Sequence, residues 1–429
     1  MIGILVGGFF VLLALGIPLA FAMGIAGTLA ILHHGVFPLS LVPHRALLGA
    51  DSFSLLAIPF FILAGNLMNR GGMTDRIIAL ANAIVGRFTG GLGLGNITAS
   101  LFFSGVSGSA VADTTALGST LIPAMKKEGY SGPFSAAVTA SSSICGPIIP
   151  PSIPLVLYAL IAGGGVSVGA LFLAGVVPGL LLGLGLMVTC WWISRKRGYP
   201  VHGGVSWREF LGLLGGASFA LVMPVIIVAG VVGGVFTVTE SAAVAVLYAL
   251  LVGTLIYRQL SLRDLLEVLG SSALASAAVM IIVAMAALLG WLLAVSGFPR
   301  MLAAGLLWIS DDPLILLLMI AILLLIVGVF LEAIAALTIL VPILVPIAIA
   351  NGIDLTHLGV VVVLSLMLGL LTPPVGICLY IASQFAETKI EAVFREVVPF
   401  FLIGVGVLLL ITFLPDLALF LPNLLMGRP

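Results

Sequence analysis

Residues 104–151 read SGVSGSAVADTTALGSTLIPAMKKEGYSGPFSAAVTASSSICGPIIPP, and this stretch decides the fold. It is rich in Ser, Thr, Gly and Pro, although the chain around it is mostly apolar. Glycine and proline interrupt helices and free backbone carbonyl and amide groups. In a bilayer, interrupted backbone is tolerated only where protein or a water-filled cavity covers it. We therefore expect Ser104–Ser109 and Ser143–Pro151 to be two interrupted elements that face each other around a polar site.

The same layout returns 223 residues later, in residues 328–374. Without a gap, fourteen of the forty-seven positions in 105–151 are identical to their counterparts. Apolar composition alone would give roughly five identities, so the chain contains an internal repeat. Pro150-Pro151, for example, corresponds to Pro373-Pro374. Paired Gly/Pro-interrupted segments in two halves indicate the binding site of a secondary transporter.

The composition is that of a membrane protein. Of 429 residues, 62% are hydrophobic and 7% are charged. Many apolar runs exceed the ~20 residues that span a bilayer, and they are solid rather than alternating, which predicts an all-α polytopic membrane protein and not a barrel. The net charge is zero, so nothing indicates a nucleic-acid partner. Three scattered cysteines provide no metal-binding set, and no phosphate-binding loop of an ATPase is present.

The repeat divides the chain into two halves with an interfacial linker between them. In each half, two short helical arms form a re-entrant hairpin, because arms of ~12–16 residues do not cross a bilayer. A longer helix that is broken near its middle follows each hairpin. The first repeat is expected at 1–198, the linker at 199–216 and the second repeat at 217–429, with hairpins around 92–125 and 314–350 and broken helices at 134–162 and 358–385.

Several other elements are expected outside these segments. Residues 3–32 read as one membrane helix, kinked at Gly16-Ile17-Pro18, rather than as a removed signal peptide. Residues 33–51 read as an interfacial connector. Residues 219–257 read as one long helix broken near Gly233-Gly234, and the last span should run from Pro399 to about Leu421.

Positive charge suggests the orientation. Lys126-Lys127 and Arg195–Arg197 mark the cytoplasmic side. Five crossings in each half would invert the two repeats and place both chain ends outside, and this is the arrangement we favour. Arg258 and Arg263 fit better if 219–257 makes two crossings, an alternative that loses the inversion.

The broken segments offer ligands for a small cation. Proline donates no N–H, so carbonyl groups one turn earlier lose their helical partner. Carbonyl and hydroxyl oxygens without excess negative charge suit Na⁺, helped by the C-terminal ends of half-helices. The alternative is that the breaks are only kinks and small-residue packing contacts. The first Na⁺ site is predicted at Ser104, Ser107, Gly108, Ser109, Gly146 and Ile148, and the second at Gly328, Glu332, Ala333, Gly369, Thr372 and Pro373.

An anionic substrate is expected between the hairpins. Half-helices start after each hairpin turn and after each Pro-Pro pair, and helix N-termini attract anions. Neither hairpin turn contains Lys or Arg, so backbone amides and hydroxyls must bind a carboxylate. The predicted substrate residues are Ser107, Ser109, Ala110, Pro151, Ser152, Glu332 and Pro374.

Three acidic residues have two possible roles each. Acids in membrane segments are costly and usually functional. Glu332 either lines the site or caps its hairpin arm. Asp113 reads more readily as an acid in the first turn of a helix, and Glu240 as a cap, since Thr237 and Thr239 precede it.

Four stretches of the sequence carry a family resemblance: GVSGSAVADTTALGSTLIPAM (105–125), GPIIPPSIPLVLYA (146–159), GGVFTVTESAAVAVLYALLVG (233–253) and GLLTPPVGICLY (369–380). With them, the sequence resembles the large membrane subunit of the tripartite ATP-independent periplasmic (TRAP) transporters over essentially its whole length. The resemblance implies an elevator-type ion transporter fold and Na⁺-coupled uptake of an organic acid across a bacterial inner membrane. It also implies a small membrane subunit, which is not fused here, and a periplasmic substrate-binding protein.

Three other functions remain open. A stand-alone Na⁺- or H⁺-coupled organic-anion carrier would have the same hairpins but need no binding protein. An intramembrane enzyme would need a metal set or a nucleophile–base pair, and the sequence contains no such pattern. The two hairpins favour alternating access over the open pore of a channel.

Overall fold

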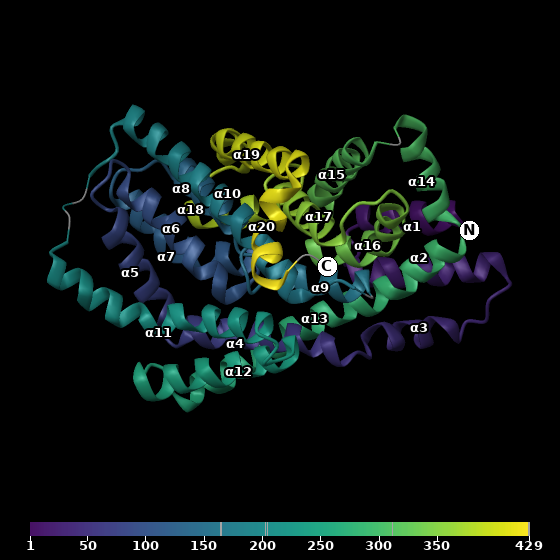
Figure 1. Ribbon diagram of the computed structural model, residues 1–429, viewed down its shortest axis with the longest axis horizontal. Helices are drawn as coiled ribbons and strands as arrows, with labels where there is room; N and C mark the ends of the chain where they lie inside the picture. Colours follow the sequence, from purple (N-terminus) through teal and green to yellow (C-terminus); the bar gives the residue numbers. More distant parts are fainter. Residues whose placement is uncertain (164, 202, 204, 311, 428–429) are drawn as a thin grey trace.

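The computed structural model describes residues 1–163, 165–201, 203, 205–310 and 312–427, and within them it contains helices and no strands (Figure 1). The helices of the first half are α1 (Ile2–Ala14), α2 (Leu19–His34), α3 (Leu41–Ala50), η1 (Phe53–Leu56), α4 (Ala57–Arg70), α5 (Met73–Val85), α6 (Gly91–Ser107), α7 (Ala110–Lys127), α8 (Gly132–Ser143), α9 (Ile153–Ala162) and α10 (Val168–Arg197). Those of the second half are α11 (Trp207–Val232), α12 (Val238–Leu251), η2 (Val252–Ile256), α13 (Leu262–Val295), α14 (Phe298–Ile309), α15 (Pro313–Phe330), α16 (Ala333–Ala350), α17 (Leu355–Gly369), α18 (Ile377–Ala386), α19 (Ile390–Phe413) and α20 (Pro415–Met426).

The expected hairpins and broken helices are present in both halves. Helices α6 and α7 turn at Gly108-Ser109, and α15 and α16 turn at Leu331-Glu332. Helices α8 and α9 are separated by the segment with Pro150-Pro151, and α17 and α18 by the segment with Pro373-Pro374; both Pro-Pro bonds are cis. The predicted architecture of paired interruptions is therefore confirmed.

The hairpin arms are longer than predicted. The first turn is shorter than Ser104–Ser109, because α6 continues to Ser107. The hydroxyl of Ser104 donates to the carbonyl of Ser100 at 2.6 Å, so this serine is accommodated inside the helix. Helices α15 and α16 have 18 residues each, long enough by length and composition to cross a membrane. The prediction that the arms are too short to cross is therefore wrong for α15 and α16.

The two repeats interlock in a symmetric way. Helix α7, the return arm of the first hairpin, packs against α18 of the second broken helix. Helix α16, the return arm of the second hairpin, packs against α9 of the first broken helix. Exchanging the two repeats converts one contact into the other, so α6–α9 and α15–α18 are related by an approximate two-fold. We call these eight helices the hairpin block.

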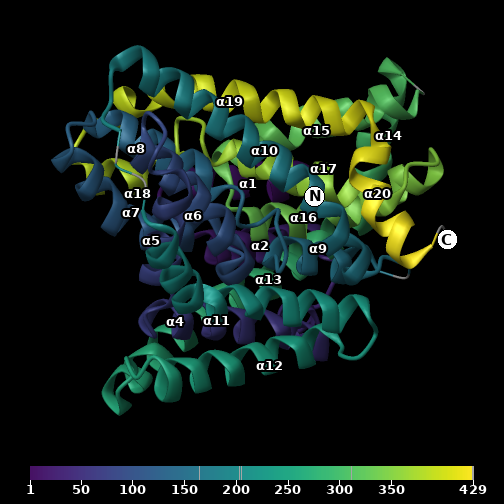
Figure 2. The ribbon, with the colours of Figure 1, turned by 60° about the vertical axis from the view of Figure 1, so that its left-hand side comes forward.

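A second group of helices forms a layer beside the hairpin block. Helix α13 packs against α2, α3 and α4, and α4 packs against α12; we call these five helices the frame. Figures 1 and 2 both show α4 and α12 toward the lower edge of the molecule, with α13 above them. The α3–α13 crossing is tight, since a methyl group on Gly49 would lie 2.2 Å from Cβ of Ala287. The Asn66 amide donates to the Ser272 hydroxyl at 2.8 Å and joins α4 to α13.

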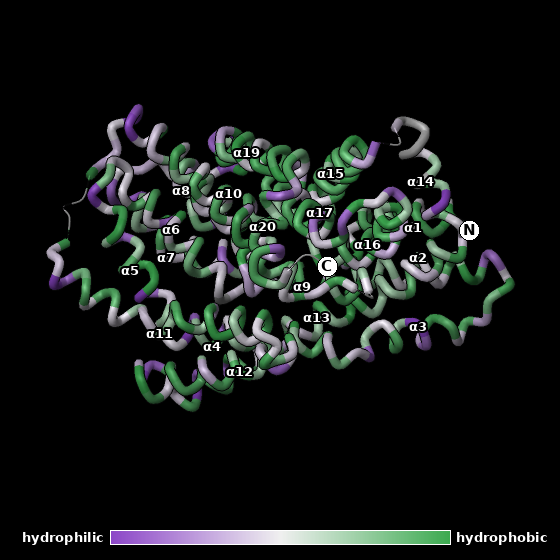
Figure 3. The backbone as a smooth tube through the Cα atoms, viewed as in Figure 1, coloured by the Kyte–Doolittle hydropathy of each residue, from purple (hydrophilic) through white to green (hydrophobic). Residues whose placement is uncertain are grey.

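The membrane character expected from composition is present. Among the described residues, eight helices are long and apolar enough to cross a membrane. The helices are mainly hydrophobic along their length, and hydrophilic residues gather mostly near their ends and in the loops (Figure 3). Leu47 and Leu262, for example, expose 71% and 76% of their surface, which suits contact with lipid.

Two predicted boundaries near the ends of the chain are wrong. Residues 3–32 are not one kinked helix but two helices, α1 and α2, that pack against each other. The connector at 33–51 contains the short helix α3, and its interfacial position remains a prediction. The last span is α19, which ends at Phe413, because Pro415 cannot continue its hydrogen bonding and starts α20 instead.

Residues 219–257 also differ from the favoured prediction of one broken crossing. They form most of α11 and all of α12 and η2, which run antiparallel: Tyr248 donates to the Phe219 carbonyl at 2.7 Å, and Tyr257 to the Gly216 carbonyl at 2.6 Å. Gly234 turns the chain with φ of +68°, which only glycine adopts readily. Both halves thus open with a pair of helices, α1 with α2 and α11 with α12.

The linker between the repeats is shorter than the predicted 199–216. Ser206 caps α11 by accepting a hydrogen bond from the Glu209 amide at 3.3 Å, so the helix begins at Trp207. Residues 202 and 204 of this linker lie outside the described residues.

The two positive clusters lie at the same end of the molecule, as predicted. Helix α7 ends at Lys126-Lys127 and α10 at Arg195–Arg197, and just beyond them Tyr130 stacks on Tyr199 with 4.3 Å between ring centroids. That this end faces the cytoplasm remains a prediction.

Replacing Gly369 with alanine is expected to destabilise the second repeat. A methyl group at Gly369 would lie 2.4 Å from the carbonyl carbon of Gly328, where α15 and α17 touch backbone to backbone. Forcing such a contact apart costs about 1–3 kcal/mol. Thermal unfolding of the purified chain measures the loss. Gly406→Ala, in α19 with no atom within 4 Å, is the matched control and should be neutral or slightly stabilising. Equal melting temperatures for the two variants would contradict the tight contact.

Candidate functional site

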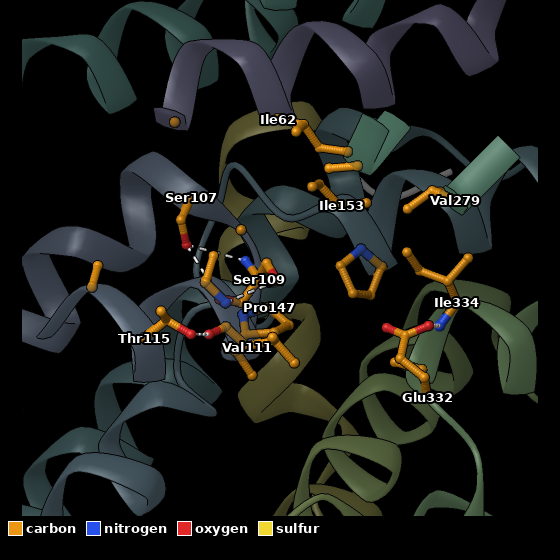
Figure 4. A pocket seen from close by; sticks show the side chains of 18 of the residues that line it. Ile62, Ser107, Ser109, Val111, Thr115, Pro147, Ile153, Val279, Glu332 and Ile334 are labelled. Atoms are coloured by element: carbon orange, nitrogen blue, oxygen red, sulfur yellow. Dashed lines mark hydrogen bonds between the residues drawn. The ribbon is translucent and has the colours of Figure 1, made fainter. Parts of the chain in front are cut away.

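The two hairpin turns open into one cavity of about 500 Å³ between the hairpin block and the frame. Figure 4 shows Ser107, Ser109 and Thr115 on one side of this space and Glu332 and Ile334 on the other. The residues that line it are Ile62, Gly65, Asn66 and Asn69 of α4; Phe103, Ser107–Ala112, Thr115, Ala116 and Ser119 of the first hairpin; Pro147, Ile153 and Pro154; Ala275 and Val279 of α13; Glu332–Ile334; and Met367 and Leu370. Both turns therefore line one cavity, and its role as a binding site remains a prediction.

The first turn rests on the break of the first broken helix. Gly108 has φ of +59°, and a methyl group there would lie 2.8 Å from the carbonyl oxygen of Pro151. Ser109 caps α7 by accepting from the Ala112 amide at 3.4 Å. The amides of Ala110 and Val111 have no acceptor in the part of the chain that the structure describes, and both residues line the cavity. The cavity is therefore bordered by unpaired backbone donors at a helix N-terminus.

Asp113 is a buried carboxylate beside this turn. Its Oδ1 accepts a hydrogen bond from the Ser107 hydroxyl, and its Oδ2 has no partner among the described residues. Gly146 leaves the space for it, since a methyl group there would lie 2.3 Å from Oδ2. The first turn of α7 does contain Asp113, but the side chain turns inward to the α8–α9 break. A buried, half-paired carboxylate is costly unless a cation or proton compensates it.

Glu332 takes both roles that the sequence left open. Its Oε2 accepts from the Ile334 amide at 2.9 Å and so caps α16. The same side chain lines the cavity, where it faces the first turn across the open space (Figure 4). No arginine or lysine is among the described residues that line the cavity. Any positive charge near Glu332 must therefore come from a bound ion or ligand.

The structure brings together only part of the predicted site residues. Ser107, Gly108, Ser109, Ala110, Glu332 and Ala333 line the cavity. Gly146 contacts Asp113 just behind the first turn. The remaining predicted residues, which do not line the cavity, are Ser104, Ile148, Pro151, Ser152, Gly328, Gly369, Thr372, Pro373 and Pro374.

Several of these remaining residues have structural contacts. The Ile148 carbonyl oxygen approaches α10, where a methyl group on Gly175 would lie 2.2 Å from it. The Ser152 hydroxyl donates to the Pro147 carbonyl and accepts from the Leu155 amide, so Ser152 caps α9. Gly328 and Gly369 form the tight α15–α17 contact.

The fit to Na⁺ differs between the two predicted sites. At the first, Ser107 and Asp113 oxygens meet the broken backbone at Gly146, a set of hard oxygen ligands with one unpaired charge. At the second, the Gly369 carbonyl accepts from the Thr372 amide at 3.0 Å. The Thr372 hydroxyl bonds the Leu368 carbonyl weakly, at 3.4 Å, and is available to another partner. The first set fits Na⁺ more fully than the second.

Sequence reasoning missed the frame's contribution and the orientation of Asp113. Asn66 and Asn69 of α4 line the cavity, and Asn69 accepts from Thr74 at 3.0 Å. Two asparagines three residues apart share one face of a helix, and amides in an apolar span are a signal of a polar site. Glu240, by contrast, is the predicted cap: it forms a capping box with Thr237.

The chain matches the family described as "Tripartite ATP-independent periplasmic transporter, DctM component" over residues 6–417. It is 43% identical over 420 residues to the sialic acid TRAP transporter large permease protein SiaM of Vibrio cholerae, covering 98% of each chain. It is 40% identical over 420 residues to the isethionate TRAP transporter permease protein DctMQ of Oleidesulfovibrio alaskensis, covering 97% of this chain and 66% of the relative. Its fold is similar to the YdaH transporter of Alcanivorax borkumensis, with a TM-score of 0.64, 15% identity and coverage of 87% and 88%.

Proposed function

Because this chain belongs to the DctM family of tripartite ATP-independent periplasmic transporters, we propose that it is the permease that couples Na⁺ entry to uptake of an organic acid. As a member of the family it is a multi-pass transporter subunit of the inner membrane, not an enzyme, and the family works with a small membrane subunit and a periplasmic binding protein. The single observation that carries the coupling proposal is the cavity that both hairpin turns share with the frame.

The first Na⁺ site lies behind the first turn, where Ser107, Asp113 and the backbone near Gly146 supply oxygen ligands. Support comes from Asp113 Oδ2, which is buried and unpartnered among the described residues. Bound Na⁺ neutralises this carboxylate and ties the turn of α6 and α7 to the broken helix. The second site, near Thr372 and the end of α17, plays the same part for the second hairpin.

The substrate lies between the two turns with a defined polarity. Its carboxylate faces the unpaired amides of Ala110 and Val111 and the hydroxyl of Ser109, since a helix N-terminus favours negative charge. Its opposite end, which faces Glu332, carries hydrogen-bond donors such as hydroxyl groups. The relatives named for sialic acid and isethionate indicate the same class, a small anion with hydroxyl groups.

Transport requires the hairpin block to move against the frame. The frame is held together by tight glycine contacts and by hydrogen bonds between α4 and α13, whereas the cavity separates it from both turns. Na⁺ binding orders the turns, and the ordered turns enclose the substrate before the block moves. Coupling then follows because cation and substrate bind to the same moving unit.

Ser107→Ala and Thr372→Ala are expected to raise the Na⁺ concentration needed for half-maximal uptake. Losing an oxygen ligand, or the partner that orients one, lowers metal affinity about 10–100-fold, and Ser107→Ala should have the larger effect because Ser107 also holds Asp113. The measurement is uptake into vesicles containing both membrane subunits, with the binding protein and the organic acid that stabilises it most. Ser119→Ala, another serine in the cavity wall, is the control. Unchanged Na⁺ activation in both variants would contradict the two sites.

A further inference from the structure

A second cavity, of about 360 Å³, lies between the frame and the hairpin block. It is in the size range of small-molecule pockets, about 300–1,000 Å³. Helices α3 and α13 form its frame side, and α9 and α16 its hairpin-block side; Figure 1 shows these four helices close together. Its walls include Gly49, Leu157, Leu160, Ala287, Trp291 and Pro342.

The interior of this cavity is suited to hydrocarbon. Only two of the described residues that line it, Ser52 and Thr338, carry a hydroxyl group. The Thr338 hydroxyl already donates to the Ile334 carbonyl at 2.6 Å inside its own helix. In a membrane protein, an apolar space of this kind between helices is available to lipid chains rather than to water.

Arg45 lies beside the cavity with unused hydrogen-bonding capacity. It is one helical turn before Gly49 on α3, so the two residues share a helix face. Its guanidinium lies over the Trp291 ring, 4.5 Å from the centroid, and Trp291 lines the cavity. Its Nε is buried without an acceptor among the described residues. Arg70 and Arg197, in contrast, pair with carboxylates at 2.6 and 2.8 Å.

The surroundings of Arg45 resemble the boundary between lipid and water. Phe37 packs against Trp291 with 5.2 Å between centroids, and His34 lies 5.8 Å from Phe37. Aromatic and basic side chains gather where lipid headgroups lie. Leu47 and Leu48, on the same helix as Arg45, expose 71% and 54% of their surface. A lipid can therefore reach Arg45 from the bilayer side of α3.

We propose that this cavity binds one anionic phospholipid, with its phosphate on Arg45 and one acyl chain running past Trp291 into the apolar space. A guanidinium stacked on an aromatic ring keeps its in-plane N–H donors free, and these match two phosphate oxygens. The chain then fills the gap between the frame and helices α9 and α16. If the hairpin block moves against the frame as proposed above, the bound lipid lies between the two moving parts.

Native mass spectrometry of the full chain, purified and mixed with phosphatidylglycerol or phosphatidylcholine in turn, tests the headgroup contact. The wild type is expected to retain one phosphatidylglycerol in preference to phosphatidylcholine. Arg45→Gln should reduce this preference about five-fold, the effect of one basic residue at an anionic surface. Arg45→Lys should keep part of it. Arg76→Gln is the matched control, because Arg76 also stacks on an aromatic ring, 3.7 Å from the Tyr257 centroid, but away from this cavity.

Gly290→Leu tests the chain contact. Gly290 lines the cavity, and the nearest atom to a methyl group there is 3.9 Å away, so a larger side chain enters the empty space. This variant should lose the retained lipid whatever its headgroup while keeping the wild-type melting temperature.

Any of three results would overturn the proposal. They are equal retention of the two lipids by the wild type, equal losses in Arg45→Gln and Arg76→Gln, and a lipid still retained by Gly290→Leu. Loss of the lipid when the small membrane subunit is bound would also overturn it, since that subunit would then be the occupant. None of these readouts depends on Na⁺ or on transport.

Discussion

Asp113→Asn is expected to remove the share of the Na⁺-dependent stabilisation of the purified chain that comes from the first Na⁺ site. Asparagine keeps the size of the side chain and a hydrogen bond to Ser107, but it removes the charge that faces the break at Gly146. At a Na⁺ concentration 100 times its dissociation constant, binding to the folded state adds about 2.7 kcal/mol. The difference between the melting temperatures in NaCl and in choline chloride measures this stabilisation by Na⁺, and the substrate need not be known.

The matched control is Asp75→Asn. Asp75 also lies in the first turn of a helix, α5, but its side chain is exposed. The Asp75→Asn variant should keep the full wild-type difference between the melting temperatures in the two salts. Asp113→Asn should show a smaller difference between the melting temperatures in the two salts than the wild type, because only the second Na⁺ site remains. In choline chloride it should melt at or above the wild-type temperature, because the unpaired buried charge is gone. A wild-type Na⁺ response in Asp113→Asn would contradict the first site.

Local chemistry explains why the hairpins and breaks were predictable. Glycine and proline act on their own and neighbouring residues, so Gly108 and Pro150-Pro151 indicate interruptions whatever surrounds them. Ser109, Ser152 and Glu332 cap the helices that follow, which is also a local property. Because the chain contains two repeats, the glycine and proline patterns occur twice. The two repeats also make matching contacts, α7 with α18 and α16 with α9.

The site depended on contacts that local patterns do not encode. Asp113 reads as an ordinary first-turn acid, and its burial becomes evident only when Gly146 is placed against it. The asparagines of α4 reach the cavity because the frame packs beside the hairpins. The sequence predicted a break near Gly233-Gly234 and favoured a single crossing, although the capping box of Thr237 and Glu240 marks the start of a new helix.

A cleavable cross-link between the frame and the first hairpin is expected to stop uptake almost completely. Asn66 of α4 in the frame and Thr115 of α7 in the hairpin block line the same cavity, so cysteines at both positions are within reach of a bifunctional thiol reagent. The cross-link fixes the distance between the two cysteines and so prevents the hairpin block from moving. Because a blocked conformational step limits turnover directly, the uptake rate should fall about ten-fold or more. Cys145, Cys190 and Cys378 are buried and are replaced by alanine in the background.

The control pair lies within the frame. Asn66 and Ala275 both line the cavity, on α4 and α13, and these helices stay joined in the variant by the ion pair of Arg70 with Asp264 at 2.6 Å. A cross-link between cysteines at 66 and 275 places the same reagent in the same cavity. It should leave most of the uptake intact, because no moving surface is bridged.

The most direct test of the central claim is Na⁺-driven uptake by the 66–115 cysteine pair before and after the cross-link is cleaved by a reductant. If the hairpin block moves against the frame, uptake by the 66–115 pair is lost on cross-linking and returns on cleavage. Uptake by the 66–275 pair persists throughout. Continued uptake through vesicles in which the 66–115 link is complete would show that the frame and hairpins need not move apart, and would contradict the mechanism.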